Sequence, residues 1–94
     1  MDNELMRLRQ VVYDTGARYR RAVSERLQIM YKPRNENARE VMRQLDSTAE
    51  EYRKAIRNLS EYLDSLETSR ESEKERVRIK VVSESFERDL NLIH

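Results

Sequence analysis

The sequence predicts an all-α protein, a long antiparallel helical hairpin followed by a third helix, in a single helical domain over residues 1–94. Three observations predict this three-helix bundle or coiled coil. Apolar residues recur at helical spacing through three segments. The chain has one glycine and one proline, so helix-breaking residues are rare. Charged residues make up 39% and hydrophobic residues 37%, a mixture typical of coiled coils and helical bundles.

Residues 4–31 are expected to form the first helix. Their apolar face follows an eleven-residue repeat, which at about 3.67 residues per turn gives a nearly straight helix. The stripe consists of Leu5, Leu8, Val12, Gly16, Tyr19, Val23, Leu27 and Met30. Gly16 lies inside the stripe, where it either lets a neighbouring helix approach closely or is simply tolerated. Pro33 should end the helix, because the residue before a proline disfavours the helical conformation.

Residues 36–67 carry the most regular pattern in the chain and are expected to form the second helix. Apolar residues alternate at spacings of four and three for four heptads, which is typical of a coiled-coil seam. The seam consists of Ala38, Met42, Leu45, Ala49, Tyr52, Ile56, Leu59, Leu63 and Leu66. Val41, Ala55 and Tyr62 widen this stripe, so it favours a bundle with two neighbours over a two-stranded coil. The turn before this helix is short, which predicts an antiparallel hairpin.

Residues 67–76 contain no apolar residue, so we expect a polar break there, followed by a third helix over residues 72–93. Apolar and basic side chains alternate over residues 76–82, as they do in a strand. Helical spacing is also present, through Ile79, Val82, Phe86, Leu90 and Ile93. A helix is favoured, because no other segment supplies a second strand and a lone strand leaves its backbone groups unpaired. The strand would require an oligomer that provides its partner.

The small core predicts association with other chains. A long, thin bundle buries a smaller fraction of its surface than a globule does. Small scaffolds therefore often depend on oligomerisation for part of their stability. We expect a homo-oligomer, or a complex with a helical protein partner.

Several kinds of chemistry lack the residues that they need. The chain has no cysteine, and its only histidine is His94. Nucleophilic triads need a base, usually histidine, and zinc sites need cysteine or clustered histidine. A single glycine cannot build a glycine-rich phosphate loop. We therefore expect no enzyme, and no catalytic, cofactor-binding or metal-ligating residue and no small-molecule substrate.

The expected location is the cytoplasm, with the nucleus as a second option. No apolar run reaches the roughly 20 residues of a membrane span. The first ten residues lack the apolar stretch of a signal peptide. A cysteine-free chain also fits a reducing compartment.

The amphipathic surfaces predict a non-enzymatic protein-binding or assembly module, such as a scaffold, an adaptor or a small helical chaperone. The core or interface seam is expected at Leu8, Val12, Tyr19, Val23, Leu27, Leu45, Ala49, Tyr52, Ile56, Leu59, Leu63 and Leu66. Candidate partner contacts are Tyr13 and Tyr31, which fall outside the stripes, together with Ile79, Val82, Phe86, Leu90 and Ile93.

The alternative is electrostatic binding to nucleic acid or to an anionic membrane surface. Residues 1–34 have eight basic and four acidic side chains, a net charge of +4, whereas residues 35–94 have eleven and fourteen, a net charge of −3. Candidate anion contacts are Arg18, Arg20 and Arg21. On a helical wheel the arginines surround the polar surface and do not form a track, which favours ion pairing with acidic helix faces.

Overall fold

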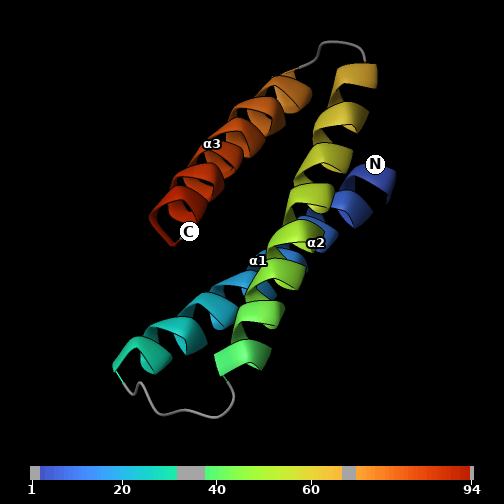
Figure 1. Cartoon of the computed structure of the whole chain (residues 1–94). Coiled ribbons are helices and arrows are strands. Elements are labelled where there is room, and N and C mark those ends of the chain that lie inside the picture. Colours follow the sequence, from blue (N-terminus) through green and yellow to red (C-terminus); the bar gives the residue numbers. More distant parts are fainter. Residues whose placement is uncertain (1–2, 32–37, 67–69, 94) are drawn as a thin grey trace.

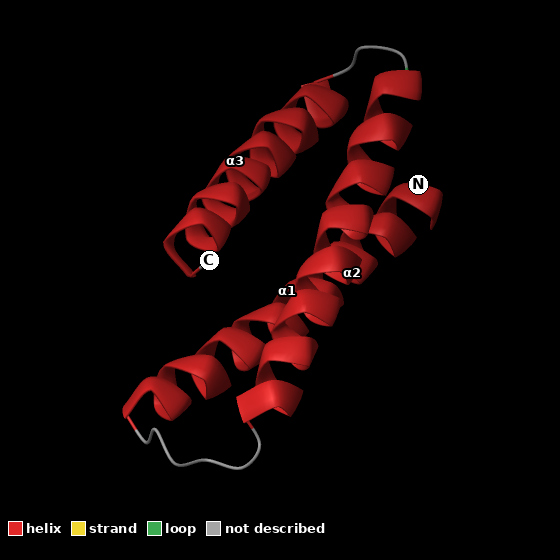
Figure 2. Cartoon of the chain, viewed as in Figure 1, coloured by secondary structure: helices red, strands yellow, loops and turns green. Residues whose placement is uncertain are grey.

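The computed structural model contains three helices, α1 (Asn3–Tyr31), α2 (Ala38–Ser65) and α3 (Arg70–Ile93) (Figure 1). The structure describes residues 3–31, 38–66 and 70–93, without the side chains of residues 29–31, 71 and 93. Within these ranges every element is a helix and none is a strand, so the all-α prediction is confirmed (Figure 2). Residues 76–82 are helical, as the sequence favoured.

The first two helices form the predicted antiparallel hairpin (Figure 1). Near the middle of both helices, Arg18 Nη1 lies 3.3 Å from Glu51 Oε2. Toward the end of α1 and the start of α2, Arg26 Nη1 donates a hydrogen bond to the sulfur of Met42. Because residue numbers rise along α1 as they fall along α2, the two contacts fix the antiparallel register.

The third helix packs antiparallel to the C-terminal half of α2. Arg53 Nε lies 3.6 Å from Glu87 Oε1, and Arg76 Nε lies 4.0 Å from Asp64 Oδ1. Among the described residues, no Cα atom of α1 lies within 8 Å of a Cα atom of α3. Helix α2 is therefore the central helix, and its wide apolar stripe serves both neighbours.

The core follows the α2 seam, with apolar side chains added from the two outer helices. Leu45 and Leu63 have no exposed surface. The other buried members are Leu8, Tyr19, Ala22, Ala49, Tyr52, Ile56, Leu59, Ile79, Phe86 and Leu90. Leu5, Val12, Val23, Tyr62, Leu66 and Val82 are partly buried against them. Leu66 thus lies at the margin of the core.

Helix α1 packs most of the predicted stripe into the core: Leu8, Gly16 and Tyr19 are buried, and Leu5, Val12 and Val23 are partly buried. The structure adds Thr15, Ala22 and Arg26, which are buried or half-buried beside that stripe. Thr15 is buried, and its hydroxyl donates a hydrogen bond of 2.7 Å to the carbonyl of Val11, so the hydroxyl has a partner there. Leu27 is 49% exposed, so its predicted core position is wrong. Small side chains at Thr15 and Ala22 let the helices approach, and hydrophobicity alone does not reveal such positions.

The polar break is shorter than predicted, because α3 begins at Arg70 and residues 70–76 are helical. Arg76 Nη2 donates to the carbonyl oxygens of Leu63, at 2.7 Å, and Leu66, at 3.3 Å. Carbonyl groups at the end of a helix lack partners within that helix. The carbonyl of Leu63 accepts a hydrogen bond of 3.2 Å from Leu66 N, just beyond α2, and Arg76 adds a charged donor to the carbonyls of Leu63 and Leu66. Ser72 is buried within the first turns of α3. Polar contacts therefore support a segment that has no apolar face.

The molecule is elongated. Its principal extents are 53 × 22 × 14 Å and its radius of gyration is 15.6 Å. A compact domain of this length would have a radius of gyration of about 12 Å. Much of each outer helix is therefore left uncovered by the rest of the chain.

Candidate functional site

Three aromatic rings, one from each helix, meet at the level where all three helices contact one another. The centroid of Phe86 lies 5.1 Å from that of Tyr19 and 4.9 Å from that of Tyr52, both edge to face. Tyr19 and Tyr52 are stacked at 5.7 Å. Such aromatic pairs stabilise a fold by more than the burial of their apolar surface alone. This aromatic cluster is the direct link between α1 and α3 at this level.

Gly16 makes room for the aromatic cluster. A Cβ atom at this position would lie 3.0 Å from Tyr52 Cε1 and 3.1 Å from Tyr52 Cζ. Both distances are shorter than ordinary van der Waals contact. Of the two interpretations of Gly16, the structure therefore supports close approach.

The two tyrosine hydroxyls of the cluster have different surroundings. Tyr19 Oη is buried and has no hydrogen-bond partner among the described residues. Burial raises the pKa of Tyr19, and the negative charge of Asp89 raises it further. Burial also raises the pKa of Tyr52, while the charge of Arg20 and its hydrogen bond act in the opposite direction. The hydroxyl of Tyr52 therefore has a cationic neighbour that the hydroxyl of Tyr19 lacks.

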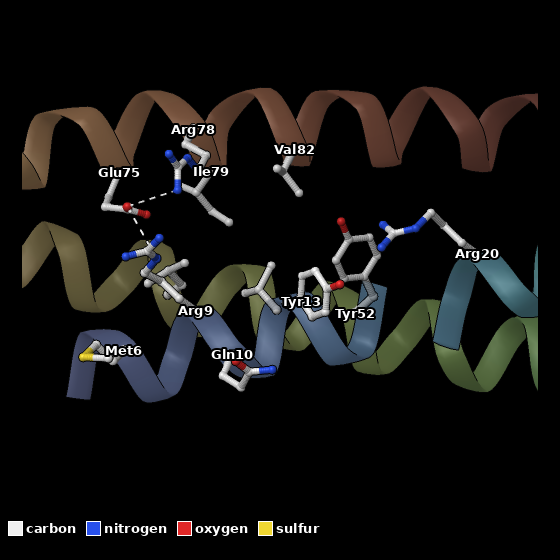
Figure 3. A pocket seen from close by; sticks show the side chains of 12 residues that line it. Met6, Arg9, Gln10, Tyr13, Arg20, Tyr52, Glu75, Arg78, Ile79 and Val82 are labelled. Carbon is white, nitrogen blue, oxygen red and sulfur yellow. Dashed lines mark hydrogen bonds and ion pairs between the residues drawn. The ribbon is translucent and has the colours of Figure 1, made fainter. Parts of the chain in front are cut away.

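A groove opens beside the aromatic cluster, with α2 at its floor and α1 and α3 as its walls (Figure 3). Its volume is about 490 Å³. The lining residues are Met6, Arg9, Gln10, Val12, Tyr13 and Arg20 from α1, Tyr52 and Leu59 from α2, and Glu75, Arg78, Ile79 and Val82 from α3. Met6 and Tyr13 on the α1 wall are 53% and 68% exposed. We call this feature the α1–α3 groove.

Glu75 forms one end of the α1–α3 groove. Its Oε1 lies 3.5 Å from Arg9 Nε and 3.5 Å from Arg78 Nη1, so two guanidinium groups share one carboxylate (Figure 3). The Glu75 side chain is only 12% exposed. With Arg20 included, the lining has three cations and one anion. Most of the other lining side chains are apolar or aromatic, so the groove combines an apolar surface with an excess of positive charge.

The seam residues occupy the interior of the chain's own bundle. Leu8, Tyr19, Leu45, Ala49, Tyr52, Ile56, Leu59 and Leu63 are buried, and Val12, Val23 and Leu66 are partly buried against them. Leu27 is the member that the structure places at the surface. The seam therefore holds α1, α2 and α3 together, and only Val12, Tyr52 and Leu59 also border the groove.

The candidate partner contacts divide into two groups. Tyr13 is exposed and lies on the groove wall. Ile79, Phe86 and Leu90 are buried in the core and Val82 is partly buried, so this stripe of α3 is already used within the chain. The side chains of Tyr31 and Ile93 lie outside the described residues.

The candidate anion contacts are not gathered into one surface. Arg18 is paired with Glu51 on α2. Arg20 lines the groove beside Tyr52, whereas Arg21 is exposed elsewhere on α1. The expected pairing of the basic face of α1 with acidic residues of α2 is seen at Arg18, and Arg9 makes a similar pair with α3.

The sequence reasoning missed Met6, Arg9, Gln10, Glu75 and Arg78, which line the groove. Met6, Gln10 and Tyr13 lie four and three residues apart, so a second, short stripe on α1 was readable from the sequence. Glu75 had no such signal, because it stands in a wholly polar segment. Its burial depends on an arginine that is 66 positions away in the sequence.

Among the described residues, no group of three or more histidine, cysteine, aspartate or glutamate side chains is placed to hold a metal ion. None of the described helices has the length and apolar character that crossing a membrane requires. Comparison of the chain with protein-family models, curated proteins and solved structures found no match.

Proposed function

We propose that this chain is a non-enzymatic protein-binding or assembly module that acts by packing its helices against a protein partner or a second copy. The observation that carries the proposal is the α1–α3 groove, where two large apolar side chains, Met6 and Tyr13, are more than half exposed. Grooves between helices that present such side chains are typical docking sites for other helices.

The shape of the molecule supports the same proposal. Helix α2 is covered on two sides, while α1 and α3 have no close backbone contact with each other among the described residues. A further helix placed between them would bury apolar surface that the chain alone leaves in contact with water. Association would therefore stabilise the bundle as well as join two proteins.

The contacts of α1 argue against the electrostatic alternative. Arg7 is paired with Glu4, Arg9 with Glu75 and Arg18 with Glu51. Phosphate binding needs cations that face outward together. Only part of the positive charge of α1 therefore remains for nucleic acid or an anionic membrane.

The non-enzymatic part of the proposal rests on composition. The sequence has no cysteine and one histidine, and the groove is lined by neither residue type. A cytoplasmic location belongs to the same proposal, since a cysteine-free chain needs no oxidising compartment.

The proposal is tested by purifying the tagged full chain from the cells that express it, at low and at high salt, and by light scattering at micromolar concentration. We expect self-association, or one co-purifying protein, that persists at high salt, because apolar packing responds weakly to salt. A monomer that retains no protein would contradict the proposal. So would binding of nucleic acid or anionic vesicles alone, lost steeply as salt rises.

A further inference from the structure

The α1–α3 groove has the position of an empty corner in a four-helix bundle. In such a bundle each helix packs against two neighbours and lies diagonally across from the remaining helix. Helices α1 and α3 both pack on α2, and only long side chains join them to each other. The three helices therefore occupy three corners, and the groove lies where the fourth helix would pack.

Along α1 the groove is long enough for a helix of about four turns, whereas α3 lines about two turns of it, from Glu75 to Val82. On α1 the lining runs from Met6 to Arg20, fourteen residues apart, which is about 21 Å of helix. The opposite wall is α3, through Arg78 and Val82. The apolar side chains between these ends would meet one face of an amphipathic helix.

The charge of the groove lining indicates which side chains should flank the apolar face of the incoming helix. Arg9 and Arg78 share the single carboxylate of Glu75, and Arg20 adds a third cation beside Tyr52. Three cations against one anion leave a net charge of +2. Carboxylates on an incoming helix would complete these interactions, while lysines or arginines would be repelled.

The same charge argues against a second copy of this chain as the occupant. In a twofold interface the residues on the symmetry axis meet their own copies, so the α1–α3 groove placed on that axis would face itself. The α1–α3 groove facing its own copy would bring six arginines together with two glutamates. A heterologous partner avoids this repulsion.

We propose that the α1–α3 groove binds an amphipathic helix of another protein, with an apolar face and acidic flanks, as the fourth helix of the bundle. This inference rests on the proposed function and adds the surface and the chemistry of the partner. A second copy of the chain and a basic helix are the occupants that the experiment distinguishes.

The probe is a fluorescent peptide of about 16 residues with leucines three and four apart and glutamates on both flanks. Its control has lysine in place of each glutamate. Anisotropy titrations with the full chain at low ionic strength should show that the acidic peptide binds about tenfold tighter or more. Amide chemical shifts should change most around Tyr13 and Val82.

Two pairs of serine substitutions locate the site. Met6→Ser with Tyr13→Ser removes apolar side chains of the groove wall and should weaken binding of the acidic peptide about tenfold. The matched control is Val77→Ser with Val81→Ser, which changes side chains on α3 that are 64% and 59% exposed and outside the groove lining. It should alter affinity less than about twofold. All four positions are exposed, and circular dichroism verifies that each variant folds.

Arg20→Gln with Arg78→Gln tests the charge and should abolish the preference for the acidic peptide. The inference is overturned by equal binding of both peptides, by no binding of either, or by equal effects of the two serine pairs. It is also overturned if the chain self-associates and Met6→Ser with Tyr13→Ser disrupts that association. In that case the groove binds a second copy of the chain. A co-purifying protein that still binds this variant would leave the proposed function standing and remove only this assignment.

Discussion

Gly16 of α1 and Tyr52 of α2 form a close pair at the centre of the hairpin: the missing Cβ of one provides the space for the ring of the other. The ring of Tyr52 has little freedom to move, because Tyr19 and Phe86 also contact it. The third atom near this position, Arg20 Nη1 at 3.2 Å, belongs to a flexible side chain. The restriction at position 16 therefore comes from Tyr52.

Gly16→Ala is expected to destabilise the chain by about 1 kcal/mol. Alanine favours a helix by about 1 kcal/mol over glycine, but overpacking a core costs about 1–3 kcal/mol. When Tyr52→Leu removes the ring, the same Gly16→Ala change should become stabilising by about 1 kcal/mol. Urea denaturation of the four variants of this double-mutant cycle measures the coupling. If Gly16→Ala stabilises the chain with Tyr52 present, the two residues are not in contact.

Arg76→Gln is expected to lower the free energy of unfolding by about 1–2 kcal/mol. The arginine donates to two carbonyl oxygens at the end of α2, and these groups lose a charged donor. Lys74→Gln is the matched control, an exposed position two residues away on the same helix. Thermal melts measure both variants, and hydrogen exchange should be faster in the last turn of α2 for Arg76→Gln. Equal melts for the two variants would show that the contact carries no stability.

The stability of the chain is expected to decrease at alkaline pH, because burial raises the pKa of Tyr19 and of Tyr52 in the folded state. A raised folded-state pKa means that the fold favours the neutral ring. The resulting contribution to the free energy of unfolding is fully present below the tyrosine pKa of the unfolded chain, about 10. It is lost as pH rises through the folded-state pKa. Urea denaturation across this range measures the loss.

Tyr19→Phe is the matched variant for this pH dependence, because it removes one of the two groups and keeps the ring. It should lose less stability above pH 10, about the usual tyrosine pKa. It should also gain about 1 kcal/mol at neutral pH, since the hydroxyl of Tyr19 is buried without a partner. An unchanged alkaline transition in Tyr19→Phe would rule out this ring as a source of the pH dependence.

The heptad seam of α2 was predictable because large apolar residues mark it without interruption. The core positions of Leu45, Ile56 and Leu63 could be predicted from their spacing alone. The matching stripe on α1 was readable from Leu5 to Val23, but Thr15 and Ala22 beside it were not, since both are small and one of them is polar. Their burial follows from how closely two backbones approach, which is a property of the pair of helices and not of either sequence segment.

The groove shows the same limit of sequence reasoning. Tyr13 stood out as an aromatic residue away from the apolar stripe, and the structure places it on the groove wall. Glu75 and Arg9 lie far apart in the sequence, and each resembles a solvated residue on its own helix. Only the packing of α1 and α3 on α2 brings them to 3.5 Å.

Ile56→Asp compared with Arg18→Glu tests whether the α2 seam holds the bundle together. Ile56 is 6% exposed, so aspartate there would bury an unpaired charge and should cost about 3–5 kcal/mol, with loss of helicity and of any association. Arg18→Glu breaks an ion pair in which both side chains are about half exposed, and such pairs contribute less than about 1 kcal/mol. Circular-dichroism melts should therefore separate the two variants widely. A native melt for Ile56→Asp would mean that residue 56 does not face the core, and the assignment of the whole seam would fail with it, because its members share one helical face.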